Sequence, residues 1–423
     1  MLLRRRRTLG HPTPLFYDEP IHAVRGEGVW LFDSEGRRYL DAYNNVPHVG
    51  HCHPHVVGAL HRQAETLNIH TRYLHESVVR YGERLTATFA PSLSTVLFVC
   101  TGTEANELAL RIARHHTRAR GILVSDFSYH GNSGTLASIA TGVQTNEAFP
   151  PDARALRLPD TLRDLCNGVT PEQLVQRALA EADAAIASLQ RAGYEVAALL
   201  LDTMFSSEGL VRLPTGYLEQ LVARVRAAGG LFIADEVQPG FGRTGEHFWG
   251  YQSYELVPDI VTLGKPMGNG HPIGATVTRP ALANAFLEDA MFFNTFAGNP
   301  VSAAAGLAVL DVIETQKLLP HAHQMGAYLQ QRLRELASRH ERVAAVRGKG
   351  LFFGFELVTD RRSGVPATAA ARRLINCMRR RGVLISTIGH HSNVLKMRPP
   401  MVFEREHADL LLATLDEALS VLD

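Results

Sequence analysis

The sequence is poor in the features that mark disulfide scaffolds, membrane proteins and nucleic-acid-binding proteins. It has only 4 cysteines among 423 residues and no CxxC pair, which argues against a disulfide framework or zinc ribbon and favours the reducing cytoplasm. No apolar run approaches the roughly 18 residues of a membrane span. The 43 Lys and Arg residues balance the 42 Asp and Glu residues. We therefore expect a cytoplasmic protein without a membrane or nucleic-acid partner.

Short apolar runs alternate with helical segments through the middle of the chain. The runs lie at residues 96–100, 122–125, 198–202, 231–235 and 260–263. Runs of this length without polar alternation are typical of parallel strands that are covered on both faces. The pattern predicts an α/β fold in which helices cover a mostly parallel sheet.

Other segments have a different pattern. Residues 28–40 predict a β-hairpin. The stretch 149–171 carries four prolines and no clear period, which indicates a surface excursion. The long helical region after Pro300 is expected to break at Pro320.

A second lobe is expected from the two ends of the chain. The strand-like run 350–357 begins a new α+β unit. We place a large domain at residues 50–315, and a small α+β domain at residues 1–49 together with residues 316–423.

Ligands bind at the carboxyl ends of the strands in sheets of this kind. After the first run, Gly102 and Thr103 open a helix, where free N–H groups and the helix dipole suit a phosphate. After the second run, Tyr129 and His130 lie on a turn, and Tyr129 could stack on a planar ring. Taken singly, these positions also fit a helix cap and ordinary packing residues.

Two charged residues follow later strands. Asp235 ends an apolar run, and Pro239 makes a helix cap there an unfavourable alternative. Lys265 lies between an apolar run and a loop rich in Pro and Gly. A lysine in apolar surroundings loses proton affinity and becomes the nucleophilic amine that a Schiff base requires.

Two further motifs carry little weight. Residues 240–245 match GxGxxG, but two acidic residues precede them and no helix is expected to follow. The histidines in residues 51–55 lack a matching set of Cys or carboxylate ligands. We predict neither a dinucleotide site nor a metal site.

A phosphate cradle, a stacking aromatic, a carboxylate and a lysine at one sheet edge together indicate pyridoxal phosphate. Asp235 would keep the pyridine nitrogen protonated, and Lys265 would form the Schiff base.

The sequence resembles the class III (fold type I) aminotransferases over nearly its whole length. The stretches that carry the resemblance are residues 28–41, 50–54, 101–106, 129–131, 234–238, 240–245, 263–265 and 294–300. The resemblance implies that Val237 and Gln238 lie against the cofactor ring and its phenolic oxygen. It also implies that Thr295 binds the cofactor phosphate of a neighbouring subunit, so that a homodimer has its active sites at the interface.

Within this family, the motifs at residues 43–54, 264–272 and 393–400 are most similar to the ethanolamine-phosphate phospho-lyases. The acidic residue that glutamate-using transaminases carry corresponds to Ser207, and their carboxylate-binding arginine corresponds to Lys396. Together with Arg243 and Arg398, Lys396 is a candidate for binding a substrate phosphate.

We hypothesise an aminotransferase that moves the amino group of an amine or amino acid to a keto acid such as pyruvate, through the Lys265 Schiff base. The alternative is a lyase that eliminates phosphate and ammonia from a phosphorylated amine. A cofactor fold that serves as a non-enzymatic scaffold is a third possibility.

Overall fold

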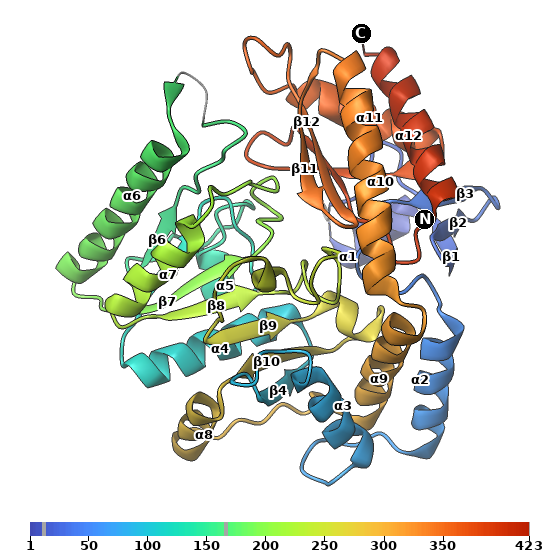
Figure 1. Ribbon diagram of the computed structural model, residues 1–423. Coiled ribbons are helices and arrows are strands. Elements are labelled where there is room, and N and C mark those ends of the chain that lie inside the picture. Colours follow the sequence, from blue (N-terminus) through green and yellow to red (C-terminus); the bar gives the residue numbers. More distant parts are fainter. Residues whose placement is uncertain (11–13, 165–167, 423) are drawn as a thin grey trace.

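The computed structural model describes residues 1–10, 14–164 and 168–422. Its centre is a seven-stranded sheet of order β4-β10-β9-β8-β7-β5-β6 (Figure 1). The strands are β4 (Thr95–Val99), β5 (Gly121–Ser125), β6 (Ala153–Leu156), β7 (Val196–Asp202), β8 (Leu231–Asp235), β9 (Ile260–Leu263) and β10 (Gly274–Thr278). The strands from β6 to β9 pair in parallel, and only β10 runs antiparallel to its two neighbours.

Helices cover both faces of this sheet. The helices of this region are α2 (Pro54–Thr66), α3 (Glu76–Thr86), α4 (Gly102–Thr117), α5 (Gly134–Ser138), α6 (Pro171–Arg191), α7 (Tyr217–Ala227), α8 (Pro280–Asp289) and α9 (Pro300–Thr315). Among them, α2 packs mainly on α9 and α5 mainly on α4. Successive residues of β7 point to opposite faces of the sheet. Leu200 belongs to the hydrophobic core that includes residues of α4 and α8, and Leu201 belongs to the core that includes residues of α6 and α7. Burial on both faces explains why the strands are continuous apolar runs.

The small domain joins both ends of the chain. Its strands are β1 (Ala23–Glu27), β2 (Trp30–Asp33), β3 (Arg38–Asp41), β11 (Val343–Lys349), β12 (Phe352–Leu357), β13 (Val383–Leu384), β14 (Ser386–Ile388) and β15 (Val394–Met397), with helices α10 (Leu318–Arg339), α11 (Thr368–Arg380) and α12 (Arg405–Ser420). Parallel pairing of Leu40 with Val383 ties β3 to β13. The predicted fold class is confirmed, whereas the domain boundaries at residues 49 and 315 stay a prediction.

Two local predictions were wrong. The excursion at residues 149–171 contains β6, which extends the sheet beyond β5. Its four residues are too few to show a period in the sequence. Pro320 does not break the helix, because it lies in the first turn of α10, where a proline removes no intrahelical hydrogen bond. The break falls at Lys317, which has a left-handed φ of 51°.

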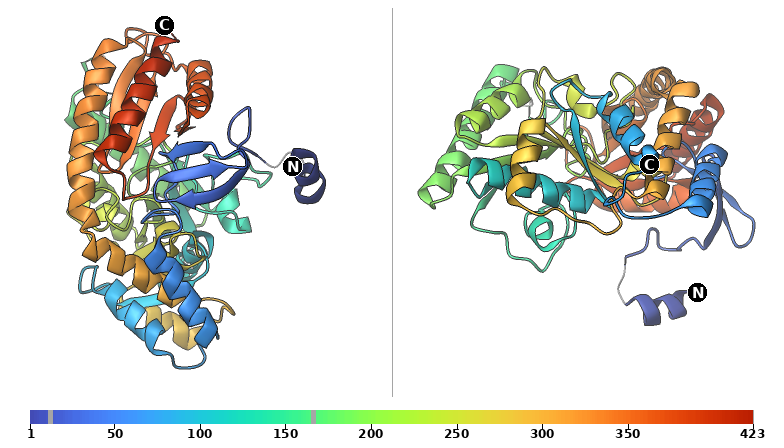
Figure 2. Two further views of the ribbon diagram at one scale, coloured as in Figure 1. Left: turned by 90° about the vertical axis from the view of Figure 1, so that its right-hand side faces the viewer. Right: turned by 90° about the horizontal axis from the view of Figure 1, so that it is seen from below.

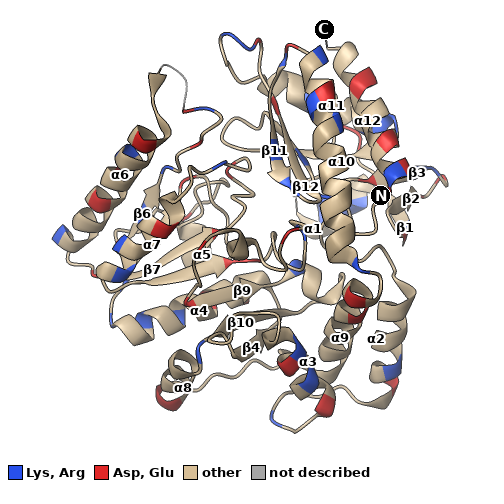
Figure 3. Cartoon of the chain, in the orientation of Figure 1, with Lys and Arg blue, Asp and Glu red and all other residues tan. Residues whose placement is uncertain are grey.

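The N-terminal helix α1 (Leu2–Leu9) projects from the body of the molecule in Figure 2. Figure 3 shows acidic and basic residues mixed along helices such as α6 rather than gathered by sign. Within the described residues, no helix has the length and apolar character to cross a bilayer.

Candidate active site

A cavity opens at the carboxyl ends of the parallel strands. Its lining residues are Thr101, Gly102, Thr103, Asn106, Tyr129, His130, Gly131, Asp202, Asp235, Val237, Gln238 and Lys265. The fold thus brings together eight residues that the sequence singled out, from the segments that follow β4, β5, β8 and β9. Asn106 and Asp202 also line the cavity and were not singled out.

The phosphate cradle predicted after β4 is the first turn of α4. Thr101 caps this helix, since its Oγ1 accepts a hydrogen bond from the Glu104 N–H at 3.1 Å. Gly102 and Thr103 are the first helical residues, so their N–H groups have no intrahelical acceptor. A Cβ at Gly102 would lie only 2.9 Å from Val237 Cγ2. Only glycine therefore fits here, and the turn presents backbone donors to an anion.

Asp235 is held by three donors. It accepts hydrogen bonds from His130 Nδ1 at 2.8 Å, from Asn106 Nδ2 at 2.9 Å and from the Val237 N–H at 3.1 Å. Burial disfavours a charged imidazole, but the hydrogen bond and charge of Asp235 outweigh it and raise the pKa of His130. The arrangement fixes one carboxylate at the base of the cavity, where it can pair with a protonated ring nitrogen.

Lys265 begins a short 3₁₀ turn, Lys265–Gly268, directly after β9. Its φ of 20° lies outside the regions that a residue with a Cβ ordinarily adopts. Burial, followed by the charge of Arg398, lowers the pKa of Lys265 to about 8. About a tenth of this amine is therefore unprotonated at pH 7, and this fraction can act as a nucleophile or base.

These groups fit pyridoxal phosphate by their chemistry. The N-terminus of α4 can bind its phosphate, and Asp235 can pair with its ring nitrogen. Lys265 can form a Schiff base with its aldehyde. Tyr129 is 39% exposed and lines the same cavity, so its ring is free to cover a planar ligand. Asn106 could have been inferred from its polar side chain on the buried face of α4, whereas nothing in the sequence placed Asp202 against Asp235.

Two buried cations lie beside the cavity. Lys396 Nζ donates to the Ser206 carbonyl at 3.1 Å and to Gln238 Oε1 at 3.2 Å. Arg398 also donates to Gln238 Oε1, and its Nε donates to the Tyr43 carbonyl at 3.0 Å. Burial and the charge of Arg398 hold the pKa of Lys396 well below its usual value.

Like Lys396 and Arg398, the other two candidates, Arg243 and Thr295, do not line the cavity of their own chain. Arg243 is fully buried and donates to the carbonyls of Leu351 and Pro399 and to His48 Nδ1 at 3.0 Å. These contacts indicate a structural link between the lobes. Thr295 is exposed at the surface of the large domain.

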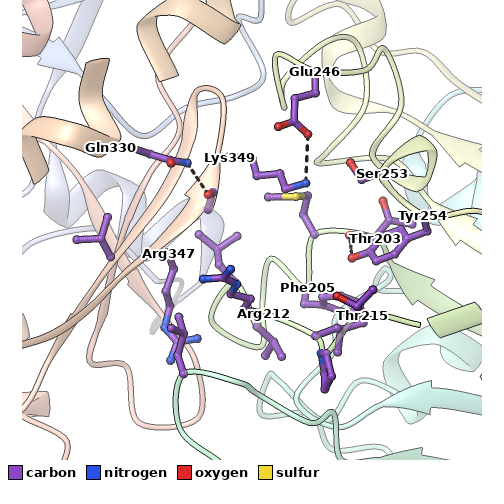
Figure 4. Close-up of a pocket in the computed structure, with 18 of the residues that line it drawn as sticks. Thr203, Phe205, Arg212, Thr215, Glu246, Ser253, Tyr254, Gln330, Arg347 and Lys349 are labelled. Carbon is purple, nitrogen blue, oxygen red and sulfur yellow. Dashed lines mark hydrogen bonds and ion pairs between the residues drawn. The ribbon is translucent and has the colours of Figure 1, made fainter. Parts of the chain in front are cut away.

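A larger cavity of about 460 Å³ lies between the loop that follows β7 and the small domain (Figure 4). Its lining includes Thr203, Phe205, Arg212 and Arg347. It holds none of the residues that the sequence analysis singled out. Size alone therefore does not locate the site.

The fold and the donor set together define an enzyme that uses pyridoxal phosphate. Residues 17–419 match the family model of the class-III aminotransferases, and the chain belongs to this family of pyridoxal-phosphate-dependent enzymes. The resemblance found in the sequence is thereby confirmed.

Individual relatives carry two kinds of name. A phospholyase from Arthrobacter, solved in complex with phosphoethanolamine, is 54% identical over 100% of both chains with a TM-score of 0.98. A Drosophila melanogaster protein named alanine–glyoxylate aminotransferase 2-like is 40% identical over 99% of this chain and 86% of its own. A Caenorhabditis elegans protein named ethanolamine-phosphate phospho-lyase homolog 1 is 36% identical over 100% of this chain and 94% of its own.

Proposed function

We propose that the protein eliminates phosphate and ammonia from a small phosphorylated amine. The observation that carries the proposal is the pair Lys396 and Arg398. In the part of the chain that the structure describes, their hydrogen-bond acceptors are the neutral oxygens of Ser206, Gln238 and Tyr43. A buried cation without a carboxylate partner is unfavourable unless an anion completes its site.

Ser207 strengthens this argument. It stands where glutamate-using transaminases carry the acid that pairs with their arginine, and it adjoins the Ser206 carbonyl to which Lys396 donates. Without that acid, both cations are available to a dianionic phosphate. The 54% identity to an Arthrobacter phospholyase in complex with phosphoethanolamine supports the same substrate class.

The cavity residues divide the remaining tasks. We assign the cofactor phosphate to Gly102 and Thr103, the ring faces to Tyr129 and Val237, and the ring nitrogen to Asp235. His130 and Asn106 orient Asp235. Gln238 Oε1 is engaged by the two cations, which leaves its amide nitrogen to donate to the phenolic oxygen of the ring.

Lys265 is the proposed acid–base group. When bound, the cofactor supplies an aldehyde for the substrate amine and a ring that withdraws electrons. The unprotonated Lys265 amine then removes a proton from the carbon beside the substrate nitrogen. Lys396 and Arg398 hold the phosphate on the neighbouring carbon and stabilise its negative charge as the carbon–oxygen bond breaks. Addition of water releases ammonia and an aldehyde.

We further propose that the active unit is a homodimer and that Thr295 completes the site of the other subunit. Large apolar side chains are exposed around it, with Met291 at 83%, Phe296 at 72% and Leu74 at 100%. An apolar surface of this kind is typical of a subunit interface. The scarcity of cysteine supports a cytoplasmic location.

The test is to incubate the holoenzyme with phosphoethanolamine in the absence of any keto acid. We expect many equivalents of free phosphate and of aldehyde per active site. Release of no more than one equivalent of aldehyde, with conversion of the cofactor to its amine form and no free phosphate, contradicts the proposal. Lys265→Ala is the control, and we expect it to lose at least about a thousandfold in rate because the acid–base group is gone.

Transamination is the second candidate. The observation in its favour is the 40% identity to the Drosophila aminotransferase-like protein. The two reactions share Lys265 and Asp235, but only transamination needs an amino acceptor. Turnover of a simple amine that depends strictly on added pyruvate would identify it.

A further inference from the structure

The loop that carries Thr295 is tied to the helix whose N-terminus we assign to the cofactor phosphate. Glu104 lies in the first turn of α4. Its Oε2 atom accepts hydrogen bonds from the Cys100 N–H at 2.8 Å and from Asn294 Nδ2 at 2.7 Å. A glutamate at this position commonly caps its helix through a backbone N–H at the helix start, which accounts for the contact with Cys100. The contact with Asn294 has no part in capping and joins the loop to the helix.

Asn294 also fixes the backbone on the far side of Thr295. Its Oδ1 atom accepts hydrogen bonds from the Phe296 N–H at 3.3 Å and from Cys100 Sγ at 3.7 Å. Burial, followed by the charge of Glu104, raises the pKa of the Cys100 thiol to about 11, so the thiol stays protonated and can donate. The residues before and after Thr295 are thus both held, while Thr295 itself is exposed.

A close contact holds the same loop a few residues further on. Gly298 has a left-handed φ of 60°, and a Cβ at this position would lie 3.2 Å from Phe98 Cβ and 2.8 Å from Thr71 Cγ2. Phe98 belongs to β4, the strand that leads into α4. The loop therefore lies directly on the strand and helix that form the phosphate cradle, and its position depends on theirs.

We propose that Glu104 and Asn294 are positioning residues that place Thr295 for the cofactor phosphate of the partner subunit. One carboxylate then connects the two phosphate sites of a dimer. The helix that Glu104 caps serves the cofactor of its own subunit, and the loop that it holds serves the cofactor of the other. The inference rests on the proposed homodimer and on the proposed role of Thr295.

The test uses mixed dimers in which only one subunit can form the Schiff base. One subunit carries Lys265→Ala and its own affinity tag, so the visible absorption band of the bound cofactor reports only the site of the other subunit. Asn294→Ala is placed either in the Lys265→Ala subunit or in the subunit that retains Lys265. Equilibrium dialysis of the loaded mixed dimer at graded concentrations of pyridoxal phosphate measures the affinity of the reporting site.

The two arrangements are expected to differ. Asn294→Ala in the Lys265→Ala subunit should weaken the affinity by about 3- to 10-fold, because the loop no longer holds Thr295 against the phosphate of the reporting site. The same substitution in the subunit that retains Lys265 should leave the affinity unchanged. Equal effects in the two arrangements, or no effect in either, overturn the inference.

Thr295→Ala in the same two arrangements separates the inference from the function on which it rests. In the Lys265→Ala subunit we expect a loss of about 10- to 100-fold, because a hydrogen bond to a charged phosphate disappears. A monomeric protein, or no effect of Thr295→Ala in this arrangement, contradicts the proposed dimeric site. An effect of Thr295→Ala without one of Asn294→Ala contradicts only the positioning role.

Glu104 provides a second test with a matched control. Glu104→Ala removes the acceptor of both hydrogen bonds, so the affinity should fall in both arrangements, in one through the helix cap and in the other through Thr295. Glu104→Gln keeps an oxygen acceptor and should stay within about twofold of the wild type. If Glu104→Gln loses as much affinity as Glu104→Ala, the charge of Glu104 matters and not its hydrogen bond to Asn294, and the inference is wrong.

Discussion

Two groups of cations meet at one sheet of the small domain, and they differ in their partners. Arg347 of β11 donates to Asp160 at 2.7 Å and to Glu356 at 2.9 Å. Arg163 donates to the same Glu356 at 2.8 Å. By contrast, Lys396 of β15 and Arg398 just beyond it donate to neutral oxygens. Both groups face the large domain, from which Asp160 and Gln238 come.

We interpret the difference as one between charges that stabilise the fold and charges that bind a substrate. In the first group each cation has a carboxylate, so the charges are satisfied and hold the two lobes together. For the second group we propose that the phosphate of the substrate supplies the anion that completes the site. The comparison predicts that the first group contributes to stability and the second to substrate affinity, and four measurements test this division.

The largest effect on stability is expected from Arg347→Met. The substitution removes the closest cation of Asp160 and leaves Glu356 with Arg163 alone, which costs up to about 3–5 kcal/mol of unfolding free energy. Urea unfolding followed by circular dichroism measures the loss. Arg347→Lys keeps the charge but loses the forked geometry of the guanidinium group. We therefore expect its unfolding free energy to lie between those of the wild type and Arg347→Met. An unchanged unfolding midpoint in Arg347→Met contradicts a structural role.

Lys396→Met is expected to weaken phosphate binding without lowering stability. It removes a buried charge without leaving a carboxylate unpaired, so the unfolding midpoint stays the same or rises. Inhibition by inorganic phosphate weakens by about 10- to 100-fold, because a charged hydrogen bond contributes about 1.5–3 kcal/mol. Competition assays on the holoenzyme measure this. If Lys396→Met lost stability but kept its affinity for phosphate, Lys396 would have a structural role and not a binding role.

The pH dependence of anion binding tests whether Lys396 binds the anion. We expect sulfate to bind the protonated form of Lys396. Burial and the charge of Arg398 hold the pKa of this lysine well below its usual value. Binding therefore takes up a proton, and sulfate affinity falls by up to about tenfold per pH unit above that pKa. Calorimetry between pH 6 and 9, chosen because sulfate does not titrate there, tests the slope. Lys396→Arg stays charged and gives a flat profile if Lys396 is the group that titrates.

The smallest effect is expected at the rim of the larger cavity. Lys349 and Glu246 pair at 3.2 Å across the two lobes, and both side chains are 45% exposed. A pair this accessible to water contributes less than about 1 kcal/mol. Lys349→Ala should therefore leave the unfolding midpoint and the phosphate affinity within error. A large change in either quantity would show that an exposed ion pair contributes as much as a buried one.

Much of the site could be predicted because its residues occupy strand ends. Gly102, Asp235 and Lys265 each follow a continuous apolar run, and parallel strands bring such positions to one edge. The four-residue strand β6 was missed because it is too short to show a period. The pairing of Asp202 with Asp235 was missed because strand order and register depend on contacts between distant segments.

The sequence by itself determined the α/β class, the class III family and eight of the residues that line the cavity, since these depend on local patterns that survive without a fold. Only the tertiary structure decided which cations are paired. Arg347 and Arg398 are both arginines on or beside strands of one sheet. The motif at residues 393–400 singled out Arg398, but no local pattern shows which of the two arginines has a carboxylate partner. The partner of each comes from a segment far away in the chain, so the packing of the two lobes decides whether a buried charge meets a carboxylate or a neutral oxygen.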